Sequence, residues 1–415
     1  MDDRFAAIRT PPRGFSLLAP LLSGRAFPAF LARFGIRRAL RKGRPLKLAG
    51  NVLAVRHADI SEMLRRDLDF IIAPVNAERI NAVNGGPFIL GMDRSLALIR
   101  EREALYRALA RVDMAAIANV VRAEAQAHLA AGGSRFDAIA DYARPVAAAT
   151  ASAVFGIAPA DKPLFAEAVR AIFAHTFLNI GGDKAIEARA LAAAPLMHQW
   201  FSTEIERRRQ TGERGSDLMG QLLRQVDQDE NDGLKLDDDF VRRTLGGMLV
   251  GSIDTTASTV ARIISVVADD PSLAAQMLER WRAGGTIYGL CLDALRRWPH
   301  NPILMRKAAA DTVLGGVLIK AGARVIAWTQ AAMQDPGAFP DPERALPDRP
   351  MASYLHFGTG LHPCAGRAIN AVQIPILVGL LLEAGAEPCG TMGWAGPFPD
   401  SLPVKTASSR ARGGE

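Results

Sequence analysis

The chain lacks most of the features that mark secreted, membrane-spanning or nucleic-acid-binding proteins. It has only three cysteines in 415 residues, none in a paired spacing, so we expect a reducing compartment and a cytoplasmic location. No apolar run reaches the roughly 18 residues of a transmembrane helix. The net charge of +7 is scattered, and no basic tract with interleaved aromatic residues points to nucleic acid as a partner.

Aromatic residues are also scarce, at 6%, whereas 49% of the chain is hydrophobic and alanine is abundant. This composition supplies a sizeable core and favours helices. No internal repeat and no shift in composition marks a domain boundary. We therefore expect one large, mainly α domain with a small β portion at residues 45–403, preceded by an N-terminal segment (1–44) and followed by a disordered tail (404–415).

The N-terminal segment begins Met-Asp-Asp-Arg and lacks the basic start and small-residue cleavage site of a signal peptide. Residues 15–42 are first apolar and then basic. A packed helix is the simpler interpretation of this pattern, and a helix that lies on a membrane surface is the alternative.

Within the domain, apolar periodicity predicts mostly helices. The longest covers residues 237–269 and would extend roughly 45 Å, enough to cross a domain. Residues 47–55 and 313–325 are expected to form short strand pairs turned by glycines. Residues 70–93 show no clear period and are expected to form a long loop. Residues 335–350 contain five prolines and predict an ordered meander.

The most informative stretch is the loop Phe-Gly-Thr-Gly-Leu-His-Pro-Cys-Ala-Gly at residues 357–366, which runs into an apolar helical pattern. Its glycines let the backbone turn tightly near a bulky group, and a helix N-terminus stabilises a thiolate. A thiolate beneath a large flat group is what a haem needs as an axial ligand. Cys364 could instead be a small buried hydrophobic residue. A zinc site lacks a fourth ligand, and a dinucleotide-binding loop lacks its third glycine and a preceding strand.

A second unusual stretch, Gly-Ser-Ile-Asp-Thr-Thr at residues 251–256, lies inside the predicted long helix. These residues are poor helix formers, and a carboxylate in apolar surroundings is costly unless it has a partner or a role. One interpretation is a buried polar turn whose polar groups all have hydrogen-bond partners. The other is a proton relay, in which Asp254 and Thr255 pass protons from solvent to a bound oxygen while Gly251 leaves room for a flat cofactor.

The loop resembles the signature of the cytochrome P450 family, Phe-Gly-x-Gly-x-His-x-Cys-x-Gly. All six fixed positions match: Phe357, Gly358, Gly360, His362, Cys364 and Gly366.

Two further stretches resemble motifs of the same family. Residues 251–256 are similar to its oxygen-activation motif, with Ser252 in place of the second glycine. By spacing alone, Asp293 and Arg296 would form a surface salt bridge. They resemble the family's Glu-x-x-Arg pair, with Asp in place of Glu, and residues 339–344 resemble its meander, which makes Arg344 the third member.

The resemblance implies a single-domain cytochrome P450 fold, with a long central helix over a haem b and the Cys-loop helix beneath it. It implies that Cys364 is the axial thiolate and that Arg306 and His362 bind haem propionates. Arg107 is assigned the third propionate contact, although Glu103 stands where His or Trp is expected and Arg102 competes. Taken alone, these arginines could equally form a solvated basic face. Asp254 and Thr255 would deliver protons during O2 activation.

The implied reaction inserts one atom of O2 into a lipophilic small molecule, by hydroxylation or epoxidation. A separate ferredoxin or flavodoxin would supply electrons and dock on the basic segment 100–111 and near Arg367. The expected pocket residues are Leu249, Val250, Ile303 and Leu304. The alternatives are a haem-thiolate enzyme that uses peroxide or rearranges a hydroperoxide, and a catalytically silent haem-binding protein.

Overall fold

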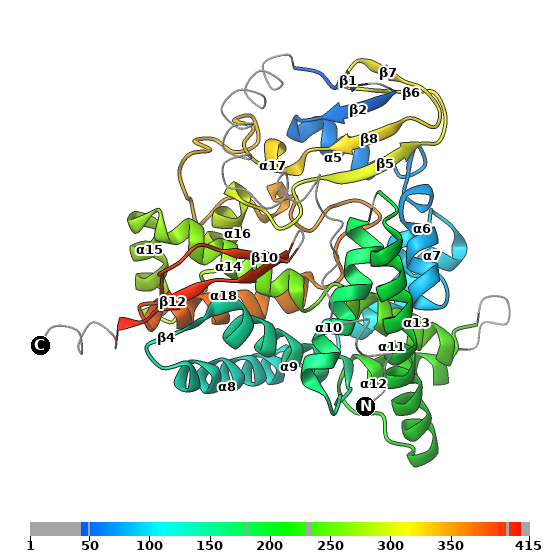
Figure 1. The fold of residues 1–415 in the computed structure, drawn as a ribbon. Helices are drawn as coiled ribbons and strands as arrows, with labels where there is room; N and C mark the ends of the chain where they lie inside the picture. Colours follow the sequence, from blue (N-terminus) through cyan, green and yellow to red (C-terminus); the bar gives the residue numbers. More distant parts are fainter. Residues whose placement is uncertain (1–42, 49, 180, 230–234, 396–397, 408–415) are drawn as a thin grey trace, which may run out of the picture.

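The protein is described by a computed structural model that covers residues 43–48, 50–179, 181–229, 235–395 and 398–407. These residues form a mainly helical body with a smaller β-rich lobe at one end (Figure 1). The expected fold class, mainly α with a small β portion, is confirmed. The interpretation of the N-terminal segment as a packed or membrane-surface helix concerns residues 1–42, which lie outside the described residues.

The β-rich lobe is built on a five-stranded sheet in the order β1-β2-β8-β5-β3. Neighbouring strands run antiparallel, except for β2 and β8, which are parallel. The strands are β1 (Leu46–Leu48), β2 (Asn51–Ala54), β3 (Phe70–Ile71), β5 (Leu304–Ala308) and β8 (Arg324–Ala327). The expected strand pair at residues 47–55 is confirmed, and its turn contains Gly50 at a φ of 80°, a conformation that favours glycine.

The lobe also contains two short helices and a hairpin, which are α5 (His57–Arg65), α17 (Thr329–Ala332), β6 (Thr312–Leu314) and β7 (Val317–Ile319). The hairpin turns at Gly315 and Gly316, both at positive φ, as the sequence predicts.

The helical body contains the remaining α-helices. They are α6 (Ala73–Asn84), α7 (Leu96–Leu109), α8 (Met114–Gly132), α9 (Arg144–Phe155), α10 (Lys162–Phe173), α11 (Lys184–Thr211), α12 (Leu218–Asp227), α13 (Asp238–Val250), α14 (Asp254–Ala268), α15 (Pro271–Arg282), α16 (Tyr288–Arg297) and α18 (Arg367–Glu383). Shorter helical turns are η2 (Ile89–Gly91), η3 (Ala138–Ala143), η4 (Ala174–Leu178) and η5 (Met351–Ser353). Many of the α-helices begin at an aspartate whose carboxylate accepts a backbone N–H, which is the usual way to cap an N-terminus.

The prediction of a long loop at residues 70–93 was wrong, because this stretch contains β3, α6 and η2. Only Ile80, Val83 and Asn84 of α6 are buried, so its apolar residues show little helical period. Its end signals were nevertheless present in the sequence. Pro74 lies in the first turn, and Gly85 closes the helix at a φ of 64°.

The prediction of one long helix at residues 237–269 was also wrong, because α13 ends at Val250 and α14 starts at Asp254. Hydroxyl groups replace the helical N–H donors at the break. The hydroxyl of Thr255 donates to the carbonyl of Gly251, and that of Thr256 donates to the carbonyl of Ser252 at 2.8 Å. Such local side-chain bonds compete with the regular helical ladder.

The C-terminal segment adds strands that the sequence did not predict. They are β4 (Arg135–Asp137), β9 (Glu387–Pro388), β10 (Gly393–Ala395), β11 (Phe398–Ser401) and β12 (Pro403–Lys405). β12 pairs with both β4 and β9. The expected boundary of the domain at residue 403 is therefore corrected, since Val404 and Lys405 belong to a sheet; residues 408–415 are not described.

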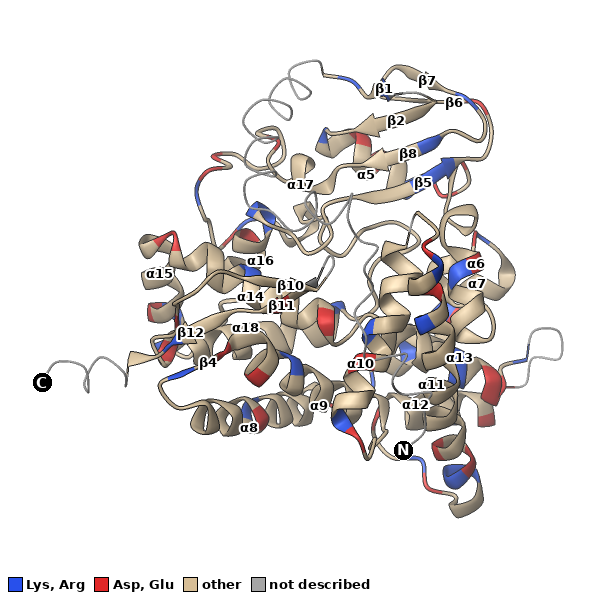
Figure 2. Ribbon diagram, in the orientation of Figure 1, with Lys and Arg blue, Asp and Glu red and all other residues tan. Residues whose placement is uncertain are grey.

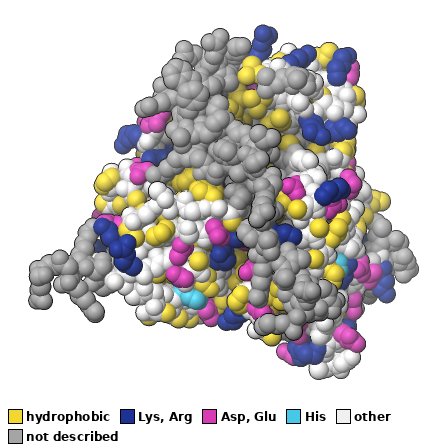
Figure 3. Space-filling view, viewed as in Figure 1, with side chains coloured by type: hydrophobic (Ala, Val, Ile, Leu, Met, Phe, Trp, Pro, Cys, Tyr) yellow, Lys and Arg dark blue, Asp and Glu magenta, His cyan; other side chains and the backbone are white. Residues whose placement is uncertain are grey.

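The second segment of the broken helix, α14, lies in the middle of the body and contacts α9, α16 and α18. Almost all of its residues are buried. Charged residues instead gather on peripheral helices such as α11 and α13 (Figure 2). On the face shown in Figure 3, basic and acidic side chains are interspersed. None of the described helices is both long and apolar enough to cross a membrane.

Candidate functional site

The Cys loop is held in a tight turn just before α18. The backbone N–H of Cys364 donates to the carbonyl of Phe357 at 2.7 Å, and Gly358 and Gly360 adopt φ values of 63° and 76°. A Cβ atom on Gly360 would lie 1.9 Å from the carbonyl oxygen of Leu64, at the end of α5. Only glycine therefore lets the loop lie this close to the β-rich lobe.

The thiol of Cys364 lies deep in the protein, yet the residue keeps some accessible surface. Burial raises the pKa of this thiol, and the nearby N–H of Gly366 opposes the shift only in part. The helix N-terminus alone therefore does not yield the stable thiolate that the sequence suggested. A cation that replaces the proton would stabilise it, and a haem iron is such a cation. Among the described residues, no group of three His, Cys, Asp or Glu side chains could hold a metal ion by itself.

Arg306 of β5 supplies a buried positive charge beside the Cys loop. Its side chain is 6% exposed, and its hydrogen bond goes to the carbonyl of the neighbouring Met305. Burial lowers the pKa of Arg306 to about 10, with Asp93 opposing the shift, but no carboxylate of the described part of the chain forms an ion pair with it. A buried guanidinium of this kind fits a carboxylate supplied by a ligand.

His362 lies close enough to Arg306 for the charge of the arginine to disfavour the protonated form of the histidine. Burial lowers the pKa of His362 first, and Arg306 lowers it further. The Nε2–H group of His362 donates to the carbonyl of Met92 at 2.8 Å. Its Nδ1 atom is left for a ligand, and a ligand carboxylate would favour the protonated ring that can donate from both nitrogens.

The structure does not place Arg107 at the site. Its side chain is 63% exposed and pairs with Glu103 on the outside of α7. Arg102 lies on the inner side, with its guanidinium 4.8 Å from the ring centre of Tyr106. The hydroxyl of Tyr106 donates to the carbonyl of Pro363 in the Cys loop, and the buried Nε of Arg102 has no hydrogen-bond partner among the described residues. The structure therefore places Arg102, the competitor named from the sequence, on the side of α7 next to the Cys loop, and Arg107 on the outside.

The break between α13 and α14 opens onto free space. Gly251 is exposed although it lies between two buried helix ends, and a Cβ atom there would meet nothing within 4 Å. Thr255 is partly exposed, one turn further along. Gln373 of α18 donates to Thr256 at 2.9 Å, so the helix that follows the Cys loop packs directly on the broken helix.

Asp254 is 4% exposed and belongs to a cluster of two acids and two arginines. Its Oδ1 atom accepts from Arg170 at 2.7 Å and from Arg144 at 3.3 Å, and both arginines also bind Asp400. Burial disfavours the charge of Arg170, but Asp254 and Asp400 together raise its pKa. The Oδ2 atom of Asp254 is buried and has no partner in the part of the chain that the structure describes. One oxygen of Asp254 is thus fixed by arginines, while the other is left without a described partner.

Sequence reasoning missed Arg144, Arg170 and Asp400, because they come from α9, α10 and β11 and carry no local motif.

The expected pocket residues divide into two pairs. Leu249 and Val250 are 0% and 6% exposed, within α13. Ile303 and Leu304 keep accessible surface and lie two or three residues before Arg306. The structure therefore supports the second pair as ligand-facing residues better than the first.

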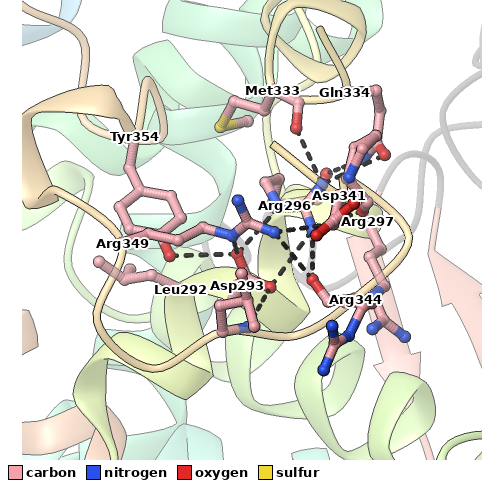
Figure 4. Close-up of polar contacts among 12 residues, drawn as sticks. Leu292, Asp293, Arg296, Arg297, Met333, Gln334, Asp341, Arg344, Arg349 and Tyr354 are labelled. Carbon is pink, nitrogen blue, oxygen red and sulfur yellow. Dashed lines mark hydrogen bonds and ion pairs between the residues drawn. The ribbon is translucent and has the colours of Figure 1, made fainter. Parts of the chain in front are cut away.

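Asp293 of α16 forms the centre of a buried ionic network (Figure 4). It is completely buried, and its Oδ1 atom lies 3.0 Å from Nε of Arg296 and 3.0 Å from Nε of Arg349. The hydroxyl of Tyr354 donates to the same oxygen at 3.1 Å. The shorter Asp side chain therefore still holds its partners.

Arg349, rather than the predicted Arg344, is the third charged member of this network. Arg344 is exposed and contributes only its carbonyl oxygen, which accepts from Arg296 at 3.3 Å and from Arg349 at 3.0 Å. The meander was located correctly, but its turn at Asp341 directs the side chain of Arg344 outwards. Sequence spacing could not show which of the two arginines turns inwards.

The site combines a thiol in a glycine loop with a buried guanidinium group that lacks a carboxylate partner. An acid–hydroxyl pair lies nearby, at the start of the helix that packs on α18. These features define a haem-thiolate type of site. The family model "Cytochrome P450" matches residues 167–280 and 293–384. The chain belongs to the cytochrome P450 family.

Named relatives and solved structures agree with this family. The "Mycinamicin IV hydroxylase/epoxidase" of Micromonospora griseorubida is 28% identical over 61% of this chain, and the chain spans 61% of its length. The "Cyclooctat-9-en-7-ol 5-monooxygenase" of Streptomyces melanosporofaciens is 29% identical, with 44% of each chain covered. The structures of CalO2 and of a mutant of P450 EryK match with TM-scores of 0.78 and 0.74, at 19% and 22% identity. They cover 92% and 91% of this chain, and 98% and 96% of those chains.

The Asp293 network predicts unequal effects for two arginines of the meander. Arg349→Ala leaves the carboxylate of Asp293 with one fewer cation and should lower the free energy of unfolding by about 3 kcal/mol. Arg344→Ala removes only an exposed side chain and should change it by less than about 0.5 kcal/mol. Thermal and denaturant unfolding of both variants would test this, and equal losses would contradict the assignment of Arg349.

Proposed function

We propose that the protein is a haem-thiolate monooxygenase that inserts one atom of O2 into a lipophilic small molecule, by hydroxylation or epoxidation. The names of the matched relatives, a hydroxylase/epoxidase and a monooxygenase, support this class of reaction. The observation that carries the proposal is Asp254, which has one oxygen fixed by arginines and the other free, beside Thr255 at an open break in the helix.

The proposed cofactor is haem b, with the thiolate of Cys364 as its axial ligand. When bound, the haem supplies the redox chemistry and the activation of O2. Arg306, His362 and Arg102 are the proposed partners of its two carboxylates. Arg306 and Arg102 have unused N–H donors beside the Cys loop, and Nδ1 of His362 becomes a donor when the ring is protonated. The turn that contains Phe357, Gly358 and Gly366 holds the thiolate in place.

Asp254 and Thr255 handle protons in this proposal. The Thr255 hydroxyl donates to the carbonyl of Gly251, and a rotation about its Cα–Cβ bond would turn it towards the open space at the break. The free Oδ2 atom of Asp254 can then carry a proton towards that space. Arg170 and Arg144 hold the other oxygen of Asp254 in place.

Electrons come from a separate ferredoxin or flavodoxin in this proposal. Arg107 of α7, Arg111 just after it and Arg367 at the start of α18 are exposed, and Tyr106 ties α7 to the Cys loop. These arginines are the proposed docking surface for an acidic partner. A cytoplasmic location and the absence of nucleic-acid partners stay predictions.

Replacing Asp254 should separate O2-dependent turnover from peroxide-dependent turnover. With a reductase system and NADH, Asp254→Asn should lower turnover about 100-fold, because the amide cannot relay protons. Turnover driven by hydrogen peroxide, which brings its own protons, should change less than about tenfold. Product formation by both routes would be measured for the same preparation.

Asp400→Asn is the matched control, because Asp400 binds the same two arginines. This substitution should lower turnover by less than about tenfold by either route. Equal losses in the two variants would mean that the cluster is only structural. Unchanged reductase-driven turnover in Asp254→Asn would favour the peroxide-using alternative, and no turnover by either route in the unaltered protein would favour a silent haem-binding protein.

The proposed docking surface predicts that reduction depends on salt. Arg367→Glu should slow reduction by an acidic ferredoxin about tenfold at low ionic strength, and added salt should abolish the difference. Lys184→Glu makes the same charge change at an exposed residue of α11 and should have little effect. Stopped-flow reduction would measure both, and a reduction rate that is independent of salt would contradict this surface.

A further inference from the structure

Arg262 of α14 is a buried arginine that has no counter-charge among the described residues. The residue is 2% exposed, and its side chain makes a single hydrogen bond, from Nε to the hydroxyl of Ser258 at 3.1 Å. Its guanidinium lies 4.7 Å from the ring centre of Trp298 and 5.3 Å from that of Trp394. Burial lowers the pKa of Arg262 to about 9, and no described carboxylate offsets that shift.

Most of the other buried arginines have a carboxylate partner. Arg208, Arg243 and Arg296 each pair with a carboxylate at 2.8 to 3.0 Å. Arg349 pairs with Asp293. Apart from Arg262, the exception among the buried arginines of the described chain is Arg306, whose unpaired charge suits a haem carboxylate. By the same reasoning, Arg262 is suited to an anionic group that the described residues do not supply.

The two indole rings cannot satisfy the terminal N–H groups of Arg262. A cation over a ring face gains electrostatic attraction, but the N–H groups at the edge of the guanidinium still need acceptors. The described residues supply an acceptor only to Nε, so the terminal N–H groups need an acceptor from a ligand or from solvent. A planar carboxylate can accept two parallel hydrogen bonds from the N–H groups at this edge. The indole rings contact the faces of the guanidinium and do not supply such acceptors.

His300 offers a second donor next to Arg262. The hydroxyl of Ser258 accepts from Arg262 Nε, so it donates its own proton to Nδ1 of His300, at 2.8 Å. The remaining proton of the ring is then on Nε2. Burial and, to a lesser extent, Arg262 lower the pKa of His300 to about 3, with Asp254 opposing the shift, so the ring is a neutral N–H donor. Like Cys364, His300 lies deep yet keeps accessible surface, as expected for a side chain that lines an internal space.

This pair of donors lies within reach of the proposed reaction centre. Asp254, Ser258 and Arg262 follow one another at intervals of four residues, so they share a face of α14. Arg262 is about 12 Å along the helix axis from Asp254. His300 precedes the ligand-facing residues Ile303 and Leu304 in the chain. The far end of a small-molecule substrate could therefore contact Arg262 while its reacting carbon lies near Thr255.

We propose that Arg262, with His300 as a second donor, binds a carboxylate of the substrate. The substrate is then an amphiphile, with a lipophilic body at the reaction centre and a carboxylate about two helical turns away. This inference rests on the proposed monooxygenase function and narrows its substrate class from neutral lipophilic molecules to lipophilic carboxylic acids.

The test measures binding rather than turnover. Haem-loaded protein would be titrated by calorimetry with dodecanoic acid, methyl dodecanoate and dodecanol, which share one hydrocarbon chain. The unaltered protein should bind the acid about 10- to 100-fold more tightly than the ester or the alcohol. Arg262→Met should abolish this preference while leaving the affinity for the ester nearly unchanged, and Arg262→Lys should restore part of it.

Arg282→Met, which removes an exposed arginine of α15, is the control and should keep the full preference. Equal affinity of the unaltered protein for acid and ester would overturn the proposal, and this comparison needs no variant to fold. A preference that persists in Arg262→Met would also overturn it. The proposal would also be overturned if chloride or formate competed for the site while the protein showed no preference for dodecanoic acid, because the site would then hold only a small ion. Failure of the proposed function is recognised separately, as haem without thiolate ligation in the same samples.

Discussion

The buried carboxylate of Asp293 is the interaction on which the rest of the site depends. It lies against two guanidinium groups, so the centre carries a net positive charge away from water. Backbone carbonyls of Met333, Pro342 and Arg344 accept hydrogen bonds from Arg296 and disperse that charge. Because Met333 lies just before the meander and Pro342 and Arg344 lie in its middle, these bonds also fix the path of this proline-rich segment.

The same centre determines where the Cys loop begins. Tyr354 donates to Asp293 and stacks on His356, with ring centres 5.6 Å apart, and Phe357 follows directly. The middle of the loop is fixed by Gly360 against α5. The segment that leads to Cys364 is thus held at two points before any cofactor contributes. The replacement of Glu by Asp at position 293 does not loosen this arrangement, because Tyr354 and the backbone of Leu346 also bind the carboxylate.

Buried charges in this protein fall into two groups with different meanings. Asp293 and Asp254 each lie in a network of acids and arginines from the chain itself, although one oxygen of Asp254 stays free. Arg306 and Arg262 have no carboxylate partner among the described residues. We interpret the first as a partner for the cofactor and the second as a partner for the substrate, because an unpaired buried guanidinium is stable only when a ligand completes it.

The sequence predicted those parts of the site that rest on short local patterns. The Cys loop, the pair Asp293 and Arg296, and the acid–hydroxyl pair at 254–255 were all found in this way. Arg349 was missed because the inward turn of its side chain depends on tertiary packing. The break after Val250 was missed because a hydroxyl can replace a helical N–H without any change in apolar periodicity. Arg262 was hidden within an apolar helix, where sequence alone shows neither its burial nor its lack of a counter-charge.

The most direct test of this account is the absorption spectrum of the purified, dithionite-reduced protein under carbon monoxide. The account predicts a strongly red-shifted Soret band, which reports a thiolate bound to the haem iron, and its loss in Cys364→Ser. A band at the position of haem with a neutral axial ligand, or a preparation that binds no haem, would contradict the assignment of Cys364.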